Sequence, residues 1–300
     1  MISVGAPPLP ADDAAIEAAR ANVSQESRAW RHFKSDVRGW FGLGVVVALV
    51  LLAVGAPLVS GDPLRIDLDA ALQPPSFTNI LGTDVQGRDV WSRLVYGARV
   101  SLLVGIVSQG IALSLGVGLG LVAGYYGRWI DETVMRLADV TLAFPSLLLL
   151  IAMSAAFSPS LTVVCVTIGV VGWAGMARLV RGQVLVVREL EYVQAMRAIG
   201  ARDTRILLRH VLPNVAAPVL IAVTLGVAGA VMAEAALSFL GLGVQPPTPS
   251  WGAMIADGRD LSQLRGAPWT SLAPGLAIGA AVLGFNLLGD AVRDATDPRN

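Results

Sequence analysis

The longest charge-free stretch of the chain runs from Val140 to Ala177 and reads VTLAFPSLLLLIAMSAAFSPSLTVVCVTIGVVGWAGMA. One α-helix over these 38 residues would be about 57 Å long, whereas the hydrocarbon core of a bilayer is about 30 Å thick. Ser158-Pro159-Ser160 interrupts the stretch near its middle, where a helical hairpin would turn. The stretch therefore predicts two antiparallel membrane-spanning helices.

The composition of the whole chain is that of an integral membrane protein. Of its 300 residues, 54% are hydrophobic and only 15% are charged, whereas soluble domains carry about 25% charged residues. The 22 basic and 22 acidic residues cancel, so the net charge gives no support to a nucleic-acid partner. The single cysteine, Cys165, excludes an internal disulfide bond and a multi-cysteine metal site.

The charge-free stretches together predict six transmembrane helices. The predicted spans are about 39–60, 100–124, 140–157, 161–177, 214–235 and 268–289. These spans and the segments between them form a transmembrane domain over 39–300, with external caps at 61–98 and 236–267 and a cytoplasmic loop at 178–213. Residues 1–38 form an N-terminal tail, of which 1–27 are predicted to be mobile because they are rich in Ala, Pro and acidic residues.

The distribution of basic residues predicts the orientation. If both termini are cytoplasmic, 16 of the 22 basic residues lie on the inner side. The six on the outer side are Arg65, Arg88, Arg93, Arg99, Arg259 and Arg265. Basic residues accumulate in cytoplasmic segments, so we expect an all-α polytopic protein with both termini in the cytoplasm.

The loop between the fourth and fifth spans carries a distinctive pattern, which from 188 to 214 reads RELEYVQAMRAIGARDTRILLRHVLPN. Residues 189–199 favour a helix, with acidic residues in the first turn and a basic one near the end. Gly200 suits the left-handed position that follows a helix. Asp203 or Thr204 can cap a second helix running toward Pro213. The pattern predicts two short helices that are tied to two spans at once.

This loop resembles the EAA coupling loop of permease subunits of ATP-binding-cassette (ABC) importers. The motif has EAA, three residues, Gly, nine residues and Ile-x-Leu-Pro. The chain matches it at Ala195, Gly200, Leu212 and Pro213, and it departs from it at Gln194, Met196 and His210. In place of these three residues the motif has Glu, Ala and Ile.

Four further blocks resemble, in order, the permeases for dipeptides, oligopeptides and nickel. They are LGTDVQGRDVWSR at 81–93 with 96–102, GYYGRWID at 124–131 with 135–139, EAALSFLGLG at 234–243 with 249–252, and NLLGD at 286–290 with 293–299. Together with the coupling loop they cover nearly all of the chain beyond residue 35. The resemblance is to the C-type member of a permease pair.

The resemblance implies a type I ABC importer permease fold in the bacterial plasma (inner) membrane. It also implies a heterodimer with a paralogous permease subunit, two cytoplasmic ABC ATPase subunits, an external solute-binding protein, and short peptides as solute. The chain has no Gly-x-x-x-x-Gly-Lys-[Ser/Thr] phosphate loop, so ATP and Mg would be bound by the partner ATPases. We expect no catalytic residue, cofactor or metal in this chain.

The predicted ATPase-coupling site lies within the 189–213 loop. Its residues are Gln194, Ala195, Met196, Arg197, Gly200 and Ala201. We expect Ala195, Met196 and Gly200 to make most of the contact, because small residues allow close packing, and Gln194 and Arg197 to lie at the rim.

Other ionisable residues have a structural interpretation beside a functional one. Asp139 and Glu234 adjoin charge-free spans, where a carboxyl group either makes a structural ion pair or faces the substrate pathway. For Asp84 and Asp89 a metal site is less well supported than a turn cap at Asp84 and an ion pair of Asp89 with Arg88 or Arg93.

Two alternative functions remain open at this point. A nickel or metal-chelate permease of the same family would show the same spans and motifs. An ion-coupled secondary transporter would call for inverted repeats or paired ionisable residues within spans, and the sequence shows neither convincingly.

Overall fold

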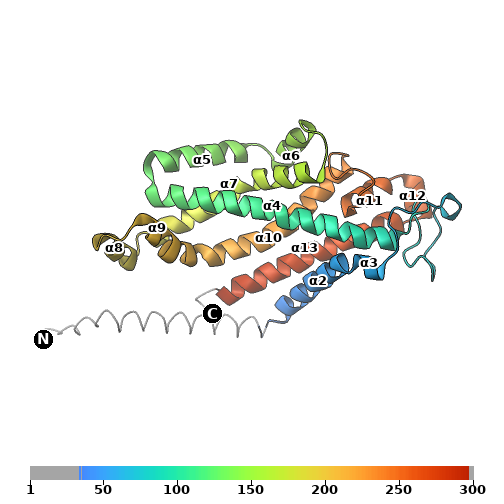
Figure 1. Ribbon diagram of the computed structural model, residues 1–300, viewed down its shortest axis with the longest axis horizontal. Coiled ribbons are helices and arrows are strands. Elements are labelled where there is room, and N and C mark those ends of the chain that lie inside the picture. The colour runs from blue at the N-terminus through green and yellow to red at the C-terminus, as the bar shows by residue number, and fades with distance from the viewer. Residues whose placement is uncertain (1–33, 35, 297–300) are drawn as a thin grey trace.

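The computed structural model of the chain describes residue 34 and residues 36–296. The tail 1–27 and the C-terminal residues 297–299, both considered above, lie outside this part. The described chain is an elongated helical bundle (Figure 1). Its long helices are α2 (Val37–Val54), α4 (Val90–Tyr126), α5 (Arg128–Ala143), α7 (Leu161–Val187), α10 (Leu212–Phe239) and α13 (Trp269–Thr296). The shorter elements are α3 (Ala56–Val59), η1 (Leu68–Ala70), α6 (Ser146–Ala155), α8 (Glu191–Ala198), α9 (Asp203–Ile206), the π-helical turn η2 (Leu207–Val211), α11 (Trp251–Asp257) and α12 (Leu261–Gly266).

The bundle has two distinct ends, which lie at opposite sides of Figure 1. The α8 end carries α8, α9 and the turn between α4 and α5. The α11 end carries α3, α11, α12 and the long loop from Ser60 to Asp89. The long helices α4, α7, α10 and α13 lie between these ends, and α2 packs beside α13 toward the α11 end (Figure 1).

Helices of membrane-spanning length and composition make up most of the described residues. Five helices there are long and apolar enough to cross a membrane: α2, α4, α7, α13 and the continuous helix Asp203–Phe239. The pair α5 and α6 also passes when taken together, but it is bent by 89° at its break. The count is therefore five spans, or six with the bent pair, which confirms an all-α polytopic membrane protein.

The predicted span at 140–157 is not a single helix. α5 already begins at Arg128 and ends at Ala143, and α6 begins at Ser146. Pro145 lacks an N–H group and pushes the preceding residue out of helical geometry, and Phe144 has φ −89° and ψ 138°. The charge-free stretch thus contains a second break, besides the turn before α7, where Ser160 Oγ accepts a hydrogen bond from the Val163 N–H at 3.2 Å.

Several helices extend beyond the predicted spans. α4 begins at Val90, inside the predicted external cap, because the Asp89 carboxylate accepts the N–H of Ser92 at 2.8 Å and caps the helix. α7 continues to Val187 and carries Arg178 and Arg181, which form ion pairs with Asp139 and Asp131 of α5. Charges therefore interrupt the apolar stretches without ending the helices.

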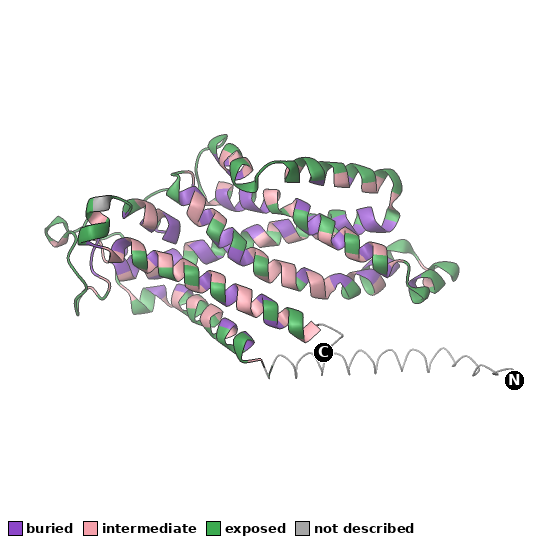
Figure 2. Ribbon diagram, turned by 180° about the vertical axis from the view of Figure 1, so that it is seen from behind, coloured by how far each residue is buried: buried purple, intermediate pink, exposed green. Residues whose placement is uncertain are grey.

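Close packing of α4 against α7 forms the centre of the bundle. Glycines at every fourth position of α4 face α7: a Cβ at Gly116 would lie 2.5 Å from Met176 Cβ, and one at Gly120 would lie 2.6 Å from the carbonyl oxygen of Ala177. Small residues at this spacing let helix backbones approach closely. Figure 2 shows buried residues along the inner faces of the rods, and an outer layer of α5 and α6 that is largely exposed.

Candidate functional site

The predicted coupling loop forms α8, a sharp turn and α9 at one end of the bundle. α8 has Glu191 in its first turn and Arg197 in its last turn, the placement that the helix dipole favours. Gly200 has φ +79°, the left-handed conformation expected after a helix. Its N–H donates to the carbonyl of Arg197 at 3.0 Å, and the Ala201 N–H donates to the carbonyl of Met196 at 3.0 Å. This pair of bonds closes the C-terminus of α8 as a Schellman motif.

The second helix differs from the sequence prediction at both of its ends. Its N-cap is Arg202, which makes no side-chain cap, rather than Asp203 or Thr204. At its other end α9 passes through η2 into α10 without a break. The wider π turn accommodates Pro213, whose ring prevents an ordinary helical hydrogen bond. The predicted coupling loop is therefore continuous with a membrane-spanning helix.

Tyr125, at the end of α4, holds α8 and α9 together. The Arg197 guanidinium lies 4.5 Å from the centroid of the Tyr125 ring, a cation–π contact, and Arg197 Nε donates to the Tyr125 hydroxyl at 3.3 Å. The same hydroxyl donates to Asp203 Oδ1 at 2.7 Å. Arg197, predicted at the rim of the docking surface, thus fastens α8 to α4.

A second set of contacts fastens α8 to the start of α10. Asn214 Nδ2 donates to the Tyr192 hydroxyl at 3.0 Å and to the carbonyl of His210 at 2.6 Å. Partial burial raises the pKa of Tyr192 above its ordinary value. Val193 is fully buried in a cluster with Ile206 and other residues of α4, α7 and α10. α8 cannot move without these helices.

The six predicted coupling residues do not share one surface. Gln194, Ala195, Arg197 and Gly200 are exposed. Met196 and Ala201 are half-buried and pack against the buried cluster, so they form the base of the site rather than its contact face.

Two exposed apolar side chains in this region, one beside the turn and one in η2, were missed by the sequence prediction. Ile199 is 76% exposed and Leu208 is 62% exposed. Leu208 lies in an open groove whose lining also includes Gly200, Arg202, Arg205 and Arg209. Ile199 stands directly before the left-handed Gly200. A large apolar side chain at that position is the sequence feature that could have indicated an exposed apolar residue here. Ile199 is therefore exposed beside the turn, and Leu208 is exposed in a groove lined by three arginines.

The two carboxyl groups considered above lie elsewhere in the bundle. Asp139 pairs with Arg178, and both side chains are more than half exposed. Glu234 is fully buried near the α11 end, where its carboxyl accepts hydrogen bonds from the hydroxyls of Ser101 at 3.0 Å and Ser238 at 2.7 Å. Neither residue contributes to the surface formed by α8 and α9.

The charged residues before α4 are arranged differently from the expectation. Asp84, rather than Asp89, pairs with Arg88 and Arg93, and Asp89 caps α4. In the part of the chain that the structure describes, no three His, Cys, Asp or Glu side chains are grouped as metal ligands.

Comparison with known proteins gives matches over nearly the whole chain. The family described as "Binding-protein-dependent transport system inner membrane component" matches residues 116–300, and "N-terminal TM domain of oligopeptide transport permease C" matches residues 24–75.

Individual relatives match at similar length. The dipeptide transport system permease protein DppC of Alkalihalophilus pseudofirmus is 45% identical, over 92% of this chain and 91% of that protein. The oligopeptide transport system permease protein OppC of Bacillus subtilis is 38% identical, over 93% and 92%. The di/tripeptide permease DppC of Pseudomonas aeruginosa is 42% identical, over 90% and 91%.

A solved structure shares the fold. A chain of the MetNI methionine ABC transporter in an inward-facing conformation superposes with a TM-score of 0.55 at 21% identity, over 68% of this chain and 97% of that one. The chain therefore has an ABC importer permease fold, and it belongs to the family of inner-membrane components of binding-protein-dependent transport systems.

Proposed function

We propose that this permease subunit forms half of the pathway of an ATP-driven importer for short peptides. The relatives that match it over most of their length are dipeptide, tripeptide and oligopeptide permeases, and this supports peptides as the solute. Both termini and the α8 end face the cytoplasm, where two ATPase subunits bind and hydrolyse ATP. A solute-binding protein delivers the peptide at the α11 end.

The observation that carries this proposal is the exposed turn at Ile199 and Gly200, on a helix fastened to α4 and α10. A partner that binds this surface moves both helices, because Arg197 of α8 contacts Tyr125 of α4 and the Tyr192 hydroxyl of α8 accepts a hydrogen bond from Asn214 of α10. ATP binding then shifts the population between two packings of the bundle through the contacts of the ATPase with this turn.

A paralogous permease subunit supplies the other half of the pathway. α5 supports this part of the proposal, because its buried residues are Val134 and Ala138, whereas Trp129 is 72% exposed and Leu137 is 57% exposed. A helix with so little cover in its own chain fits the surface of a neighbouring membrane subunit or lipid. The C-type resemblance indicates a heterodimer.

Substitution of Gly200 tests the coupling role. Beyond the two neighbouring residues, no atom lies within 4 Å of a Cβ added at Gly200, so the position is open and Gly200→Trp places a large side chain in the proposed docking surface. Gly200→Ala is the matched control, because it carries the same backbone strain at φ +79° with little bulk. In the reconstituted importer we expect Gly200→Trp to lower peptide uptake and the stimulation of ATPase by loaded binding protein at least tenfold. Gly200→Ala should stay within about threefold of the unmodified protein. Wild-type stimulation and uptake in Gly200→Trp would remove this turn from the mechanism.

Competition for uptake tests the solute. Unlabelled dipeptides and tripeptides should compete with a labelled dipeptide for uptake by the reconstituted importer. Nickel chelates should not compete, and competition by chelates alone would assign the chain to the metal-chelate branch of the family.

A further inference from the structure

The loop from Ser60 to Asp89 presents a single, completely exposed aromatic side chain. Phe77 has a relative exposure of 108%, and Ile80 beside it is 59% exposed. The loop reaches the extreme tip of the molecule, beyond the end of α3 (Figure 1). An apolar side chain held out in this position has no packing role in its own chain.

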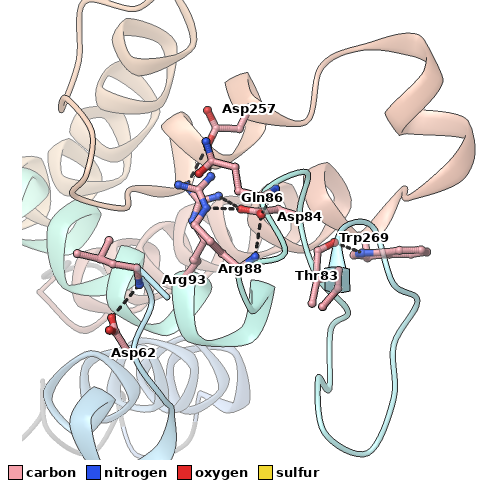
Figure 3. Close-up of polar contacts among 10 residues, drawn as sticks. Asp62, Thr83, Asp84, Gln86, Arg88, Arg93, Asp257 and Trp269 are labelled. Carbon is pink, nitrogen blue, oxygen red and sulfur yellow. Dashed lines mark hydrogen bonds and ion pairs between the residues drawn. The ribbon is translucent and has the colours of Figure 1, made fainter. Parts of the chain in front are cut away.

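The stem of this loop is rigid. The Thr83 N–H donates to the carbonyl of Gln73 at 3.0 Å, and the Leu72 N–H donates to the carbonyl of Asp84 at 3.0 Å. Leu72 has φ +55°, a conformation that costs free energy in a residue with a branched side chain. Trp269 of α13 also donates its indole N–H to the carbonyl of Thr83 at 3.1 Å (Figure 3).

Buried charges fix the same stem to the bundle. Asp84 accepts hydrogen bonds from the side chains of Arg88 and Arg93, and Arg93 also donates to Asp257 of α11 at 2.9 Å (Figure 3). Asp84 and Arg93 are almost completely buried. Removal of either partner would leave a buried charge unpaired, so this network holds the loop in one place.

The tip of the loop is a preformed turn. The Ser76 N–H donates to the carbonyl of Asn79 at 2.8 Å, and the Asn79 N–H donates to Ser76 Oγ at 3.1 Å. Pro74 and Pro75 precede the turn and restrict the backbone further. Phe77 is therefore presented at little entropic cost, which is the arrangement of an aromatic anchor at a protein–protein interface.

We propose that Phe77 is the anchor by which the external solute-binding protein docks on this subunit, in an apolar pocket with a basic margin. The net negative charge of the exposed residues in this loop favours a protein partner over a lipid surface. Exposed Asp62, Asp67 and Asp69 outnumber the one exposed basic residue of the loop, Arg65, so anionic headgroups would repel the loop. The inference rests on the proposed orientation, in which the α11 end is external.

The test measures how binding protein engages the complete reconstituted importer. Phe77→Ala should raise the concentration of loaded binding protein that gives half-maximal ATPase stimulation at least tenfold, with the maximal stimulated rate within twofold of the unmodified importer. Phe157→Ala is the matched control, because Phe157 is also exposed, at 58%, but lies in the turn between α6 and α7. It should change the half-maximal concentration less than twofold.

Each other outcome contradicts the proposal in a distinct way. An unchanged half-maximal concentration in Phe77→Ala would overturn the proposal that Phe77 is the anchor. Because ATPase stimulation would still be seen at saturating binding protein, that result would leave the proposed import function intact. A lower yield of the assembled permease pair would place Phe77 at the partner permease. Quenching of Phe77→Trp fluorescence by brominated lipid in the absence of binding protein would place it in the membrane.

Discussion

Glu234 is a carboxyl group buried in an otherwise apolar helix, and its surroundings explain how the chain accommodates it. Its two oxygens accept hydrogen bonds from Ser101 of α4 and Ser238 of α10. The Ser101 hydroxyl in turn accepts the N–H of Trp251, the first residue of α11, at 3.3 Å. A buried polar group is tolerated when every hydrogen bond is satisfied, so this group connects α4, α10 and α11.

We expect Glu234 to be structural, which makes two substitutions informative. Glu234→Gln retains an acceptor and adds a donor that can reach a serine hydroxyl, so uptake should stay within twofold. Glu234→Ala leaves a cavity and unpaired hydroxyls and should destabilise the subunit by about 2–4 kcal/mol. Thermal unfolding of the purified complex and peptide uptake measure the two effects. A folded Glu234→Gln complex without uptake would instead assign the carboxyl to the substrate pathway.

The close packing of α4 against α7 depends on particular glycines of α4, which differ from the other glycines of that helix in facing α7. A Cβ at Gly120 would lie 2.6 Å from a backbone oxygen of α7, whereas no atom lies within 4 Å of one at Gly118. Gly120→Val should therefore push the two helices apart, at a cost of about 1–3 kcal/mol or more, and lower the melting temperature of the complex. Gly118→Val, on another face of the same helix, should leave it nearly unchanged. Equal losses in both variants would show that the glycines pack against a different subunit.

Apolar stretches and charge predicted most of the long helices but neither their ends nor the helix α5. The apolar stretches show which part of a helix hydrocarbon can surround. The helices of the structure extend beyond these stretches where a polar or charged side chain in the extension finds a partner elsewhere in the chain. Arg178 and Arg181 continue α7 because Asp139 and Asp131 of α5 neutralise them, and these pairs join residues roughly 40 to 50 positions apart in the chain. No local pattern reveals such a pairing.

The turn after α8 could be predicted only in part, because some of its features depend on local sequence and others on distant contacts. Gly200 and the helix before it follow local rules, since a left-handed residue after a helix is best filled by glycine. The inward rotation of Met196 follows from packing against the cluster that contains Tyr125 and Val193. Because Tyr125 is distant in sequence, the sequence could predict the turn after α8 but not which of its side chains face outward.

The continuous helix Asp203–Phe239 connects the two ends of the molecule. Its 37 residues correspond to a rod of about 55 Å. Tyr125 and Asn214 bind α8 near one end of this rod, and Glu234 and Ser238 lie near the other end, beside the start of α11. The helix therefore connects the turn after α8 to the α11 end, with the π turn η2 and Pro218 as the irregular points along it.

Orientation of the whole bundle is the property on which both proposals depend, and the single cysteine makes it measurable. Cys165 is buried among apolar residues, so Cys165→Ala removes the background thiol at a small cost in stability. In that background we expect Thr78→Cys to react with a membrane-impermeant maleimide in intact spheroplasts, because the proposed orientation places the loop at 60–89 outside. Ala198→Cys, exposed at the end of α8, should react only in inverted vesicles or after permeabilisation. The two sites lie at opposite ends of the bundle, so each serves as the control for the other. The reverse pattern would place the basic α8 end outside, against the 16 of 22 basic residues that the proposed orientation puts in the cytoplasm.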